Sequence, residues 1–200
     1  MTFAQQPEES MLMNFGILFM TLNGMWVASE ILLIVLSRSK SSGRDYDDGS
    51  LKWLNIIIYS CVALAVSVGF LGIGRLHASG SLIPWAGLYI IAFGLIVRWS
   101  AIMKLRNFFT VNVVIQSDHR IIKTGIYKFV RHPSYSGALI SFFGLGLAFS
   151  NWISIVLLVV PVAVAFLKRI QIEEQALKSA FGEEYIKYRK TTWALFPWVY

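Results

Sequence analysis

The sequence predicts an all-α integral membrane protein of about five transmembrane helices. The last two are expected to form a short helix–turn–helix hairpin, followed by a cytosolic amphipathic C-terminal helix. Of the 200 residues, 56% are hydrophobic and only 14% are charged, and the mean hydropathy is +0.61. The apolar residues are gathered into long runs, and the basic residues lie in the loops beside those runs. Both features are typical of a membrane protein and not of a soluble domain.

Three long apolar runs occupy the first half of the chain. A spanning helix needs about 20 apolar residues, and Met11–Leu36 meets that length with Glu30 as an acidic interruption. Trp53–Ile73 contains no charged residue. Leu82–Ile102 contains Arg98 as its only charged residue. The long side chain of Arg98 is expected to reach the membrane interface near the end of the helix. These runs predict three spanning helices.

The next two apolar runs are shorter. Tyr135–Phe149 and Trp152–Leu167 have 15 and 16 residues and are separated by two polar residues. As helices, each would rise only about 24 Å, less than the ~30 Å hydrocarbon core. We therefore expect a tight hairpin that enters and returns on the same side, with Gly144 and Gly146 letting its two arms approach closely.

The C-terminal tail mixes charged residues with regularly spaced apolar ones. Across Lys168–Lys190 this pattern predicts an amphipathic helix that lies at the membrane interface. Gly182 is expected to break that helix into two pieces, because glycine commonly ends helices.

The distribution of Lys and Arg predicts the orientation. The loop at 37–52 has four such residues, the loop at 103–134 has six and the tail from Lys168 has six more, whereas the connection at 75–81 has one. Because basic loops stay in the cytoplasm, the N-terminus is expected outside and the C-terminus inside. The net charge of +7 then fits membrane lipids with anionic headgroups, and no nucleic acid partner is expected.

Several function classes are poorly supported. Cys61 is the only cysteine, so neither a disulfide nor a cysteine metal site can form within one chain. The three histidines fall on different segments without helical metal spacing, so no metal is expected. The chain also has no nucleophile elbow, phosphate loop or dinucleotide-binding glycine pattern. The N-terminus lacks the basic start of a signal peptide, so the first apolar run is expected to remain in the mature protein.

Basic and aromatic residues are concentrated where the second basic loop meets the hairpin. Arg131 and His132 can be read as an interfacial arginine and a helix cap, and Pro133 suits a first helical turn. Equally, the free amides of that turn and the helix dipole would bind a ligand carboxylate. Tyr127 and Tyr135 are either interfacial aromatics or rings that stack on a purine or contact a sulfonium cation.

A second polar cluster follows one apolar hairpin later. Arg169 and Glu173 are four residues apart and share one helix face, which by itself predicts a surface ion pair worth about 0.3–0.5 kcal/mol. Because the hairpin returns to its starting side, this cluster and Glu174 are expected to approach Arg131 and His132 at the membrane surface. Glu30 is either functional or paired with a nearby arginine, and both readings stay open.

The residues from 116 to 197 resemble the isoprenylcysteine carboxyl methyltransferase family of integral membrane enzymes, in the five-span form of prokaryotic members. The string Arg-His-Pro-x-Tyr alone is less specific, because membrane sterol reductases and phospholipid methyltransferases carry similar strings. The joint pattern is more specific. Its pieces are Gly125-Ile126-Tyr127, Arg131-His132-Pro133-Ser134-Tyr135-Ser136-Gly137, Arg169, Glu173-Glu174, Phe181-Gly182-Glu183-Glu184-Tyr185-Ile186-Lys187-Tyr188 and Pro197.

The resemblance implies methyl transfer from S-adenosylmethionine to the carboxylate of a lipid-like acceptor such as a prenylated cysteine, at the cytoplasmic membrane face. It implies that Arg169 is the catalytic residue that binds the acceptor. It divides the chain into three membrane spans at 1–110 and a cofactor-binding, catalytic region at 111–200, in the plasma (inner) membrane of a prokaryote. The cofactor-binding positions that it implies are Gln116, His119, Arg120, Ile121, Ile122, Tyr127, His132, Pro133, Ser134, Tyr135 and Glu173.

Three other functions remain as alternatives. The same scaffold could methylate a phospholipid or a small thiol or amine. A membrane NADPH-dependent sterol-type reductase is less favoured, because Ser134 and Ala138 stand where those enzymes typically carry Asn and an acidic residue. A scaffold without activity is disfavoured by the joint presence of Tyr127, His132 and Arg169.

Overall fold

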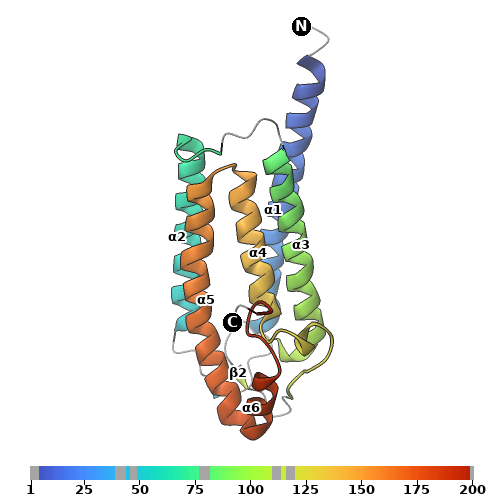
Figure 1. Cartoon of the computed structure of the whole chain (residues 1–200), viewed down its shortest axis with the longest axis vertical. Coiled ribbons are helices and arrows are strands. Elements are labelled where there is room, and N and C mark those ends of the chain that lie inside the picture. Colours follow the sequence, from blue (N-terminus) through green and yellow to red (C-terminus); the bar gives the residue numbers. More distant parts are fainter. Residues whose placement is uncertain are drawn as a thin grey trace.

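The structure is a computed structural model that describes residues 5–38, 44–45, 49–76, 82–109, 114–115 and 120–198. Within them the chain forms an elongated bundle of helices (Figure 1). Its elements are α1 (Gln5–Arg38), β1 (Arg44–Asp45), α2 (Ser50–Leu71), α3 (Leu82–Leu105), η1 (Arg106–Phe108), β2 (Val114–Ile115), η2 (Gly125–Lys128), α4 (Pro133–Ala148), α5 (Trp152–Phe181) and α6 (Glu183–Lys190). β1 and β2 form a short antiparallel pair.

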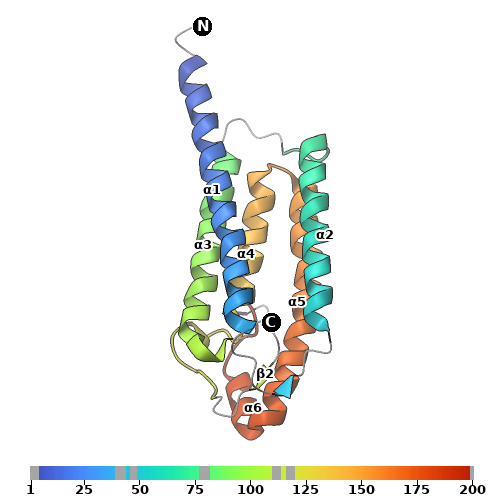
Figure 2. The same cartoon turned by 180° about the vertical axis from the view of Figure 1, so that it is seen from behind.

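Among the residues that the structure describes, four helices are long and apolar enough to cross a membrane. They are α1 (over Ser10–Val35), α2, α3 and α5, and the fifth apolar helix, α4, has only 16 residues. With these candidate spans, the protein is a multi-pass integral membrane protein of the predicted all-α class. α4 runs beside the long helices (Figures 1 and 2).

The helix ends that flank the basic loops lie together at one end of the bundle. The end of α1, the start of α2, the end of α3, the start of α4 and the end of α5 all lie at the end of the bundle that carries α6 (Figures 1 and 2). The end of α2, the start of α3 and the α4–α5 turn lie at the opposite end. One end of the molecule therefore gathers the polar segments.

The expected tight hairpin is present, and its turn is held by the connection after α2. The backbone N–H of Leu76 donates to the carbonyl of Ser150 at 2.7 Å, and the Asn151 amide donates to the carbonyl of Ile73 at 2.6 Å. Asn151 also caps α5, because its Oδ1 accepts from the backbone N–H of Ser154 at 3.0 Å. These bonds fix the depth of the hairpin relative to α2.

The second arm of the hairpin is much longer than predicted. α5 has 30 residues and rises about 45 Å, because it continues through Lys168 to Phe181 without a break. The tail expected as a separate interfacial helix is thus the last part of α5 followed by α6. A change from apolar to charged composition does not end a helix; the break comes at Gly182, with φ +51°, as predicted.

The two hairpin glycines face different helices. A Cβ on Gly146 would lie 2.7 Å from the Ile155 Cα in α5, so this residue does bring the two arms together. A Cβ on Gly144 would lie 2.7 Å from the Ile91 nitrogen in α3, so the expectation that Gly144 also faces the second arm was wrong. The reason is that α4 is buried between both helices and uses small residues on two faces.

A substitution at the contact between α3 and α4 would test this packing directly. A Cβ on Gly94 would lie 2.6 Å from the Gly137 carbonyl, so we expect Gly94→Ala to destabilise the protein by about 1–3 kcal/mol through overpacking. Gly16→Ala in α1 is the matched control, since nothing lies within 4 Å of its Cβ position. Thermal unfolding in detergent should show a lower Tm for the first variant and an unchanged or higher Tm for the second. Equal values would contradict this packing.

Candidate active site

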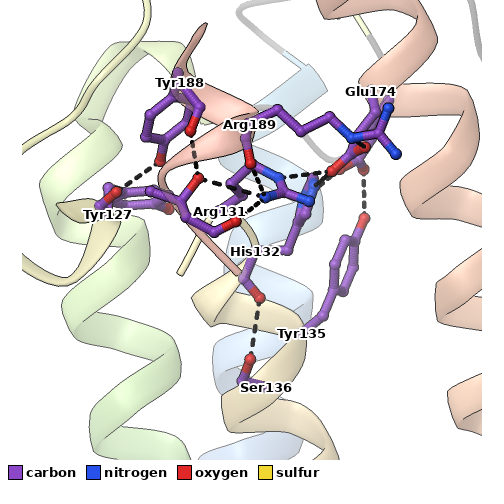
Figure 3. A network of polar contacts seen from close by, with 10 residues as sticks. Tyr127, Arg131, His132, Tyr135, Ser136, Glu174, Tyr188 and Arg189 are labelled. Carbon is purple, nitrogen blue, oxygen red and sulfur yellow. Dashed lines mark hydrogen bonds and ion pairs between the residues drawn. The ribbon is translucent and has the colours of Figure 1, made fainter. Parts of the chain in front are cut away.

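The two predicted polar clusters meet at the start of α4 (Figure 3). Arg131 Nε donates to Glu174 Oε1 at 2.8 Å, and His132 Nε2 lies 3.4 Å from the same oxygen. Arg189 of α6 adds a third cation, with its Nε 3.2 Å from Glu174 Oε2. The expected approach of these clusters is confirmed, and one carboxylate joins three segments of the chain.

The C-terminal segment holds the start of α4 in place. The His132 backbone N–H donates to the Ala194 carbonyl at 3.0 Å, and the Ser136 hydroxyl donates to the Leu195 carbonyl. Pro133 occupies the first position of α4 and is fully buried. Because proline has no N–H to lose there, the residue fits a helix start that is packed on all sides.

Glu173 is the second carboxylate of the site and points toward a different set of groups. It accepts a hydrogen bond from the Tyr135 hydroxyl. Its Oε2 lies 3.4 Å from His132 Nδ1, and its Oε1 lies 3.4 Å from Arg169 Nε. The sequence pattern therefore identified the Arg169–Glu173 pair correctly but not its setting, since Arg169 is only 2% exposed and is no surface residue.

Arg169 is anchored from two further elements. Its Nε donates to the Tyr135 hydroxyl oxygen at 3.1 Å, and its Nη1 donates to the Ser50 hydroxyl at 2.6 Å. Ser50 begins α2, so the guanidinium is held between α2, α4 and its own helix. A buried guanidinium held in this way is oriented for an additional anionic partner.

The two carboxylates beside His132 favour the charged form of its ring. Burial of the ring opposes its charged form, but hydrogen bonds to Glu173 and Glu174 outweigh that effect and raise the pKa of His132 above its ordinary value of 6.5. Each ring nitrogen lies 3.4 Å from a carboxylate oxygen, so an imidazolium can donate to both. The ring thus links the two carboxylates.

One cavity of about 480 Å³ connects this site with the apolar part of the bundle. Its apolar end lies between α1, α2 and α4, and its polar end lies beside α5, α6 and η2. The apolar lining includes Ile31, Leu54, Ile58 and Phe142. The polar lining includes Tyr127, Tyr135, Arg169, Glu173 and Tyr185. A ligand with a polar head and a long apolar tail matches this shape.

A partly buried ion pair forms part of the cavity wall and answers the open question about Glu30. Both carboxylate oxygens of Glu30 accept hydrogen bonds from Arg98, each at 2.8 Å. Arg98 also donates to the Ser134 hydroxyl at 2.9 Å. Its side chain is 12% exposed, so the expectation that it reaches the membrane interface was wrong. A carboxylate within a membrane-spanning helix needs a counter-charge, so the Glu30 carboxylate holds the Arg98 guanidinium inside the bundle.

Most of the predicted site residues converge on this cavity. The lining contains nine of them, namely Arg120, Ile121, Ile122, Tyr127, His132, Ser134, Tyr135, Arg169 and Glu173. Pro133 is fully buried instead and shapes the start of α4. Gln116 and His119 lie outside the described residues.

Other cavity-lining or supporting residues were not singled out from the sequence. Ser50 is 119 positions from its partner Arg169, and nothing in the sequence indicates that contact. Tyr185 and Tyr188 line the cavity from α6. Their spacing of three on a short helix was a usable signal, because such residues share one helix face.

Comparison with known proteins gives one consistent result. The sequence profile of the isoprenylcysteine carboxyl methyltransferase family matches residues 86–179. Protein-S-isoprenylcysteine O-methyltransferase B of Arabidopsis thaliana is 36% identical over 115 residues, which cover 56% of this chain and 58% of the relative. The Dictyostelium discoideum enzyme of the same name is 33% identical over 118 residues, which cover 58% and 50%.

A solved structure agrees with these sequence matches. The eukaryotic intramembrane Ras methyltransferase, an isoprenylcysteine carboxyl methyltransferase, superposes with a TM-score of 0.59 at 25% identity. The match covers 72% of this chain and 52% of that one. The chain therefore spans only half to about three fifths of the length of the relatives named here.

The charge on His132 leads to a pH-dependent prediction. Because its pKa is raised in the folded state, the stabilisation it provides is fully present below pH 6.5 and is lost as the pH rises through the raised value. The Tm difference between the wild type and His132→Gln, measured from pH 5.5 to 9, should therefore be largest at the acidic end. Lys123→Gln, which disrupts the exposed Lys123–Glu184 pair, is the control and should give a flat difference. A flat profile for His132→Gln would contradict the charged form.

Proposed function

We infer that this chain belongs to the isoprenylcysteine carboxyl methyltransferase family, and on that premise we propose that it transfers a methyl group from S-adenosylmethionine to a lipid-borne carboxylate. The acceptor we propose is a prenylated cysteine or a close chemical relative. The observation that carries the proposal is the position of Arg169. This buried cation stands in the lining of a cavity whose one end is apolar and whose other end is polar and aromatic.

The residues at the polar end fit S-adenosylmethionine. The cavity of about 480 Å³ is within the usual size of small-molecule sites. Tyr127 and Tyr135 offer aromatic faces to a sulfonium cation, and the Glu173 carboxylate offers negative charge. When bound, the cofactor supplies an electrophilic methyl group on sulfur. The holding residues we propose are those predicted above: Gln116, His119, Arg120, Ile121, Ile122, Tyr127, His132, Pro133, Ser134, Tyr135 and Glu173.

Arg169 is the residue that we propose binds the acceptor. A free carboxylate with an ordinary pKa near 4 is ionised at pH 7 and needs no general base. Arg169 Nη1 donates to the neutral Ser50 hydroxyl. Replacement of this hydroxyl by a carboxylate oxygen of the acceptor would give a stronger, charge-assisted hydrogen bond. The contacts of its Nε with Tyr135 and Glu173 would keep the guanidinium plane fixed. Catalysis would then rest on orientation and on exclusion of water.

The apolar end of the cavity suits the lipid tail. α1 packs on α3 and α2 packs on α5, and α4 is visible between α1 and α2 when the bundle is viewed from behind (Figure 2). Ile31 of α1 and Ile58 of α2 line the cavity on these two sides. We propose that the acceptor enters from the membrane between these helices, so that the 1–110 region receives the lipid and the 111–200 region holds the cofactor.

We also propose an orientation and a location. The polar end of the bundle carries basic segments, and this supports a cytoplasmic location for that end with the N-terminus outside. The plasma membrane of a prokaryote is the location we propose for this five-helix form. Membrane lipids and the lipid-like acceptor are its partners under this proposal.

A methyltransferase for a phospholipid or a small thiol or amine is the second candidate function. Such an enzyme would share the cofactor end of the cavity but would have no use for a buried guanidinium near the transferred methyl group. A sterol-type reductase stays disfavoured by Ser134, which stands where those enzymes typically carry Asn and which here accepts a hydrogen bond from Arg98. The next two experiments separate these activities.

The role of Arg169 is tested by Arg169→Lys, which keeps the charge but loses the planar fork. We expect S-adenosylmethionine affinity to stay within threefold, and kcat/KM for a farnesylated cysteine analogue to fall roughly 30-fold or more, since a buried charged hydrogen bond contributes at least about 2 kcal/mol. Lys178→Gln, at an exposed position on the same helix, is the control. Undiminished turnover by Arg169→Lys, or equal turnover of the acceptor's neutral amide, would reject this role.

The role of Glu173 is tested by calorimetric binding to the detergent-purified protein. Glu173→Gln keeps the shape but removes the charge, so S-adenosylmethionine affinity should fall by about 10- to 100-fold. Glu183→Gln, at an exposed position on α6, should bind like the wild type. If the wild type binds NADPH and not S-adenosylmethionine, the reductase replaces the methyltransferase as the better function.

A further inference from the structure

Tyr185 is a buried residue whose polar group has no partner within the described residues. Its side chain lies on α6, it is 2% exposed and it lines the cavity. Its hydroxyl is the only buried side-chain polar atom without a hydrogen bond in the part of the chain that the structure describes. Such an atom costs free energy in the folded state, so its presence beside a cavity indicates a ligand partner.

The neighbouring Tyr188 shows the ordinary arrangement for comparison. Its hydroxyl donates to the Tyr127 carbonyl at 2.7 Å and is satisfied by the protein itself. The two rings meet edge to face, with centroids 6.2 Å apart and planes at 64°. The Tyr185 ring is therefore fixed by packing and lines the cavity, while its hydroxyl makes no hydrogen bond within the described part of the protein.

The hydroxyl is a hydrogen-bond donor at every physiological pH. Burial is the main cause that raises the pKa of Tyr185, and the nearby Glu174 carboxylate raises it further. Arg131 and Arg189 act in the opposite direction but do not outweigh these effects. A protonated phenol in this place suits an acceptor atom such as a ligand oxygen or ring nitrogen.

The location of α6 fixes which part of a ligand can reach Tyr185. α6 lies at the end of the bundle away from the α4–α5 turn (Figure 1). Arg169 lies further up α5, between α6 and the apolar end of the cavity. A ligand group at Tyr185 is thus on the opposite side of the site from the lipid tail and from the proposed acceptor carboxylate.

We propose that the Tyr185 hydroxyl donates a hydrogen bond to a polar acceptor atom of S-adenosylmethionine that the demethylated product shares. This inference rests on the proposed function and adds a binding residue to it. Because the bond is made equally before and after methyl transfer, it contributes uniform binding and not rate. Tyr185 thereby retains the cofactor, whereas Arg169 acts on the acceptor.

Tyr185→Phe removes only the oxygen atom and tests the inference in three ways. Calorimetry should show affinity for S-adenosylmethionine and for its demethylated product lowered by the same factor, roughly threefold to tenfold. The KM for the cofactor should rise by a similar factor with kcat within twofold. The Tm of the ligand-free protein should be unchanged or higher, because an unsatisfied buried hydroxyl has been removed.

Two matched variants separate binding from structure. Tyr188→Phe loses the hydrogen bond to Tyr127 and should lower the ligand-free Tm. Tyr89→Phe removes the same atom at an exposed position on α3 outside the cavity, and should change neither affinity nor Tm. If ligand-free Tyr185→Phe loses as much stability as Tyr188→Phe, the Tyr185 hydroxyl is structural and the inference is overturned.

The binding data also distinguish this inference from the function on which it rests. If the wild type binds S-adenosylmethionine and Tyr185→Phe binds it with undiminished affinity, only this inference is overturned. A loss of affinity for only one of the two ligands would overturn the claim of uniform binding. Absence of S-adenosylmethionine binding to the wild type would overturn the proposed function and this inference with it.

Discussion

Glu174 is the carboxylate around which the polar end of the molecule is assembled. It lies on α5 with a side chain 11% exposed, and it binds Arg131 and His132 from the start of α4 and Arg189 from α6. A charge withdrawn from water to this extent costs several kcal/mol unless it is paired. The three basic residues meet that need, and in doing so they fix the relative positions of α4, α5 and α6.

The neighbouring Glu173 depends on this arrangement. With α4 and α5 held together, Tyr135 and Arg169 come within hydrogen-bonding distance of each other, and both contact Glu173. His132 contacts both carboxylates and so couples the supporting pair to the cavity-lining pair. The two adjacent glutamates have different roles because their side chains point in different directions. Glu174 faces the supporting arginines, and Glu173 faces the cavity.

Close helix packing fixes the level of this site along the bundle. Glycines on α3 and α4 bring the two backbones together, and the α4–α5 turn is bonded to the segment after α2. The start of α4 is therefore fixed at one level of the bundle, beside Arg98 and Glu30. A single cavity can then reach from apolar side chains to Arg169, which is what the proposed methyl acceptor with a lipid tail would require.

The sequence by itself determined the helical membrane class, the hairpin, the break at Gly182 and the meeting of two polar clusters. Composition and helical periodicity depend on residues that are close together in the chain, so they can be recognised from the sequence alone. Only the tertiary structure decided that α5 continues to Phe181, that Arg98 turns inward to Glu30 and that Ser50 contacts Arg169. These features depend on partners distant in the chain, because a buried charge adopts the position where another helix supplies its counter-charge or hydrogen bond.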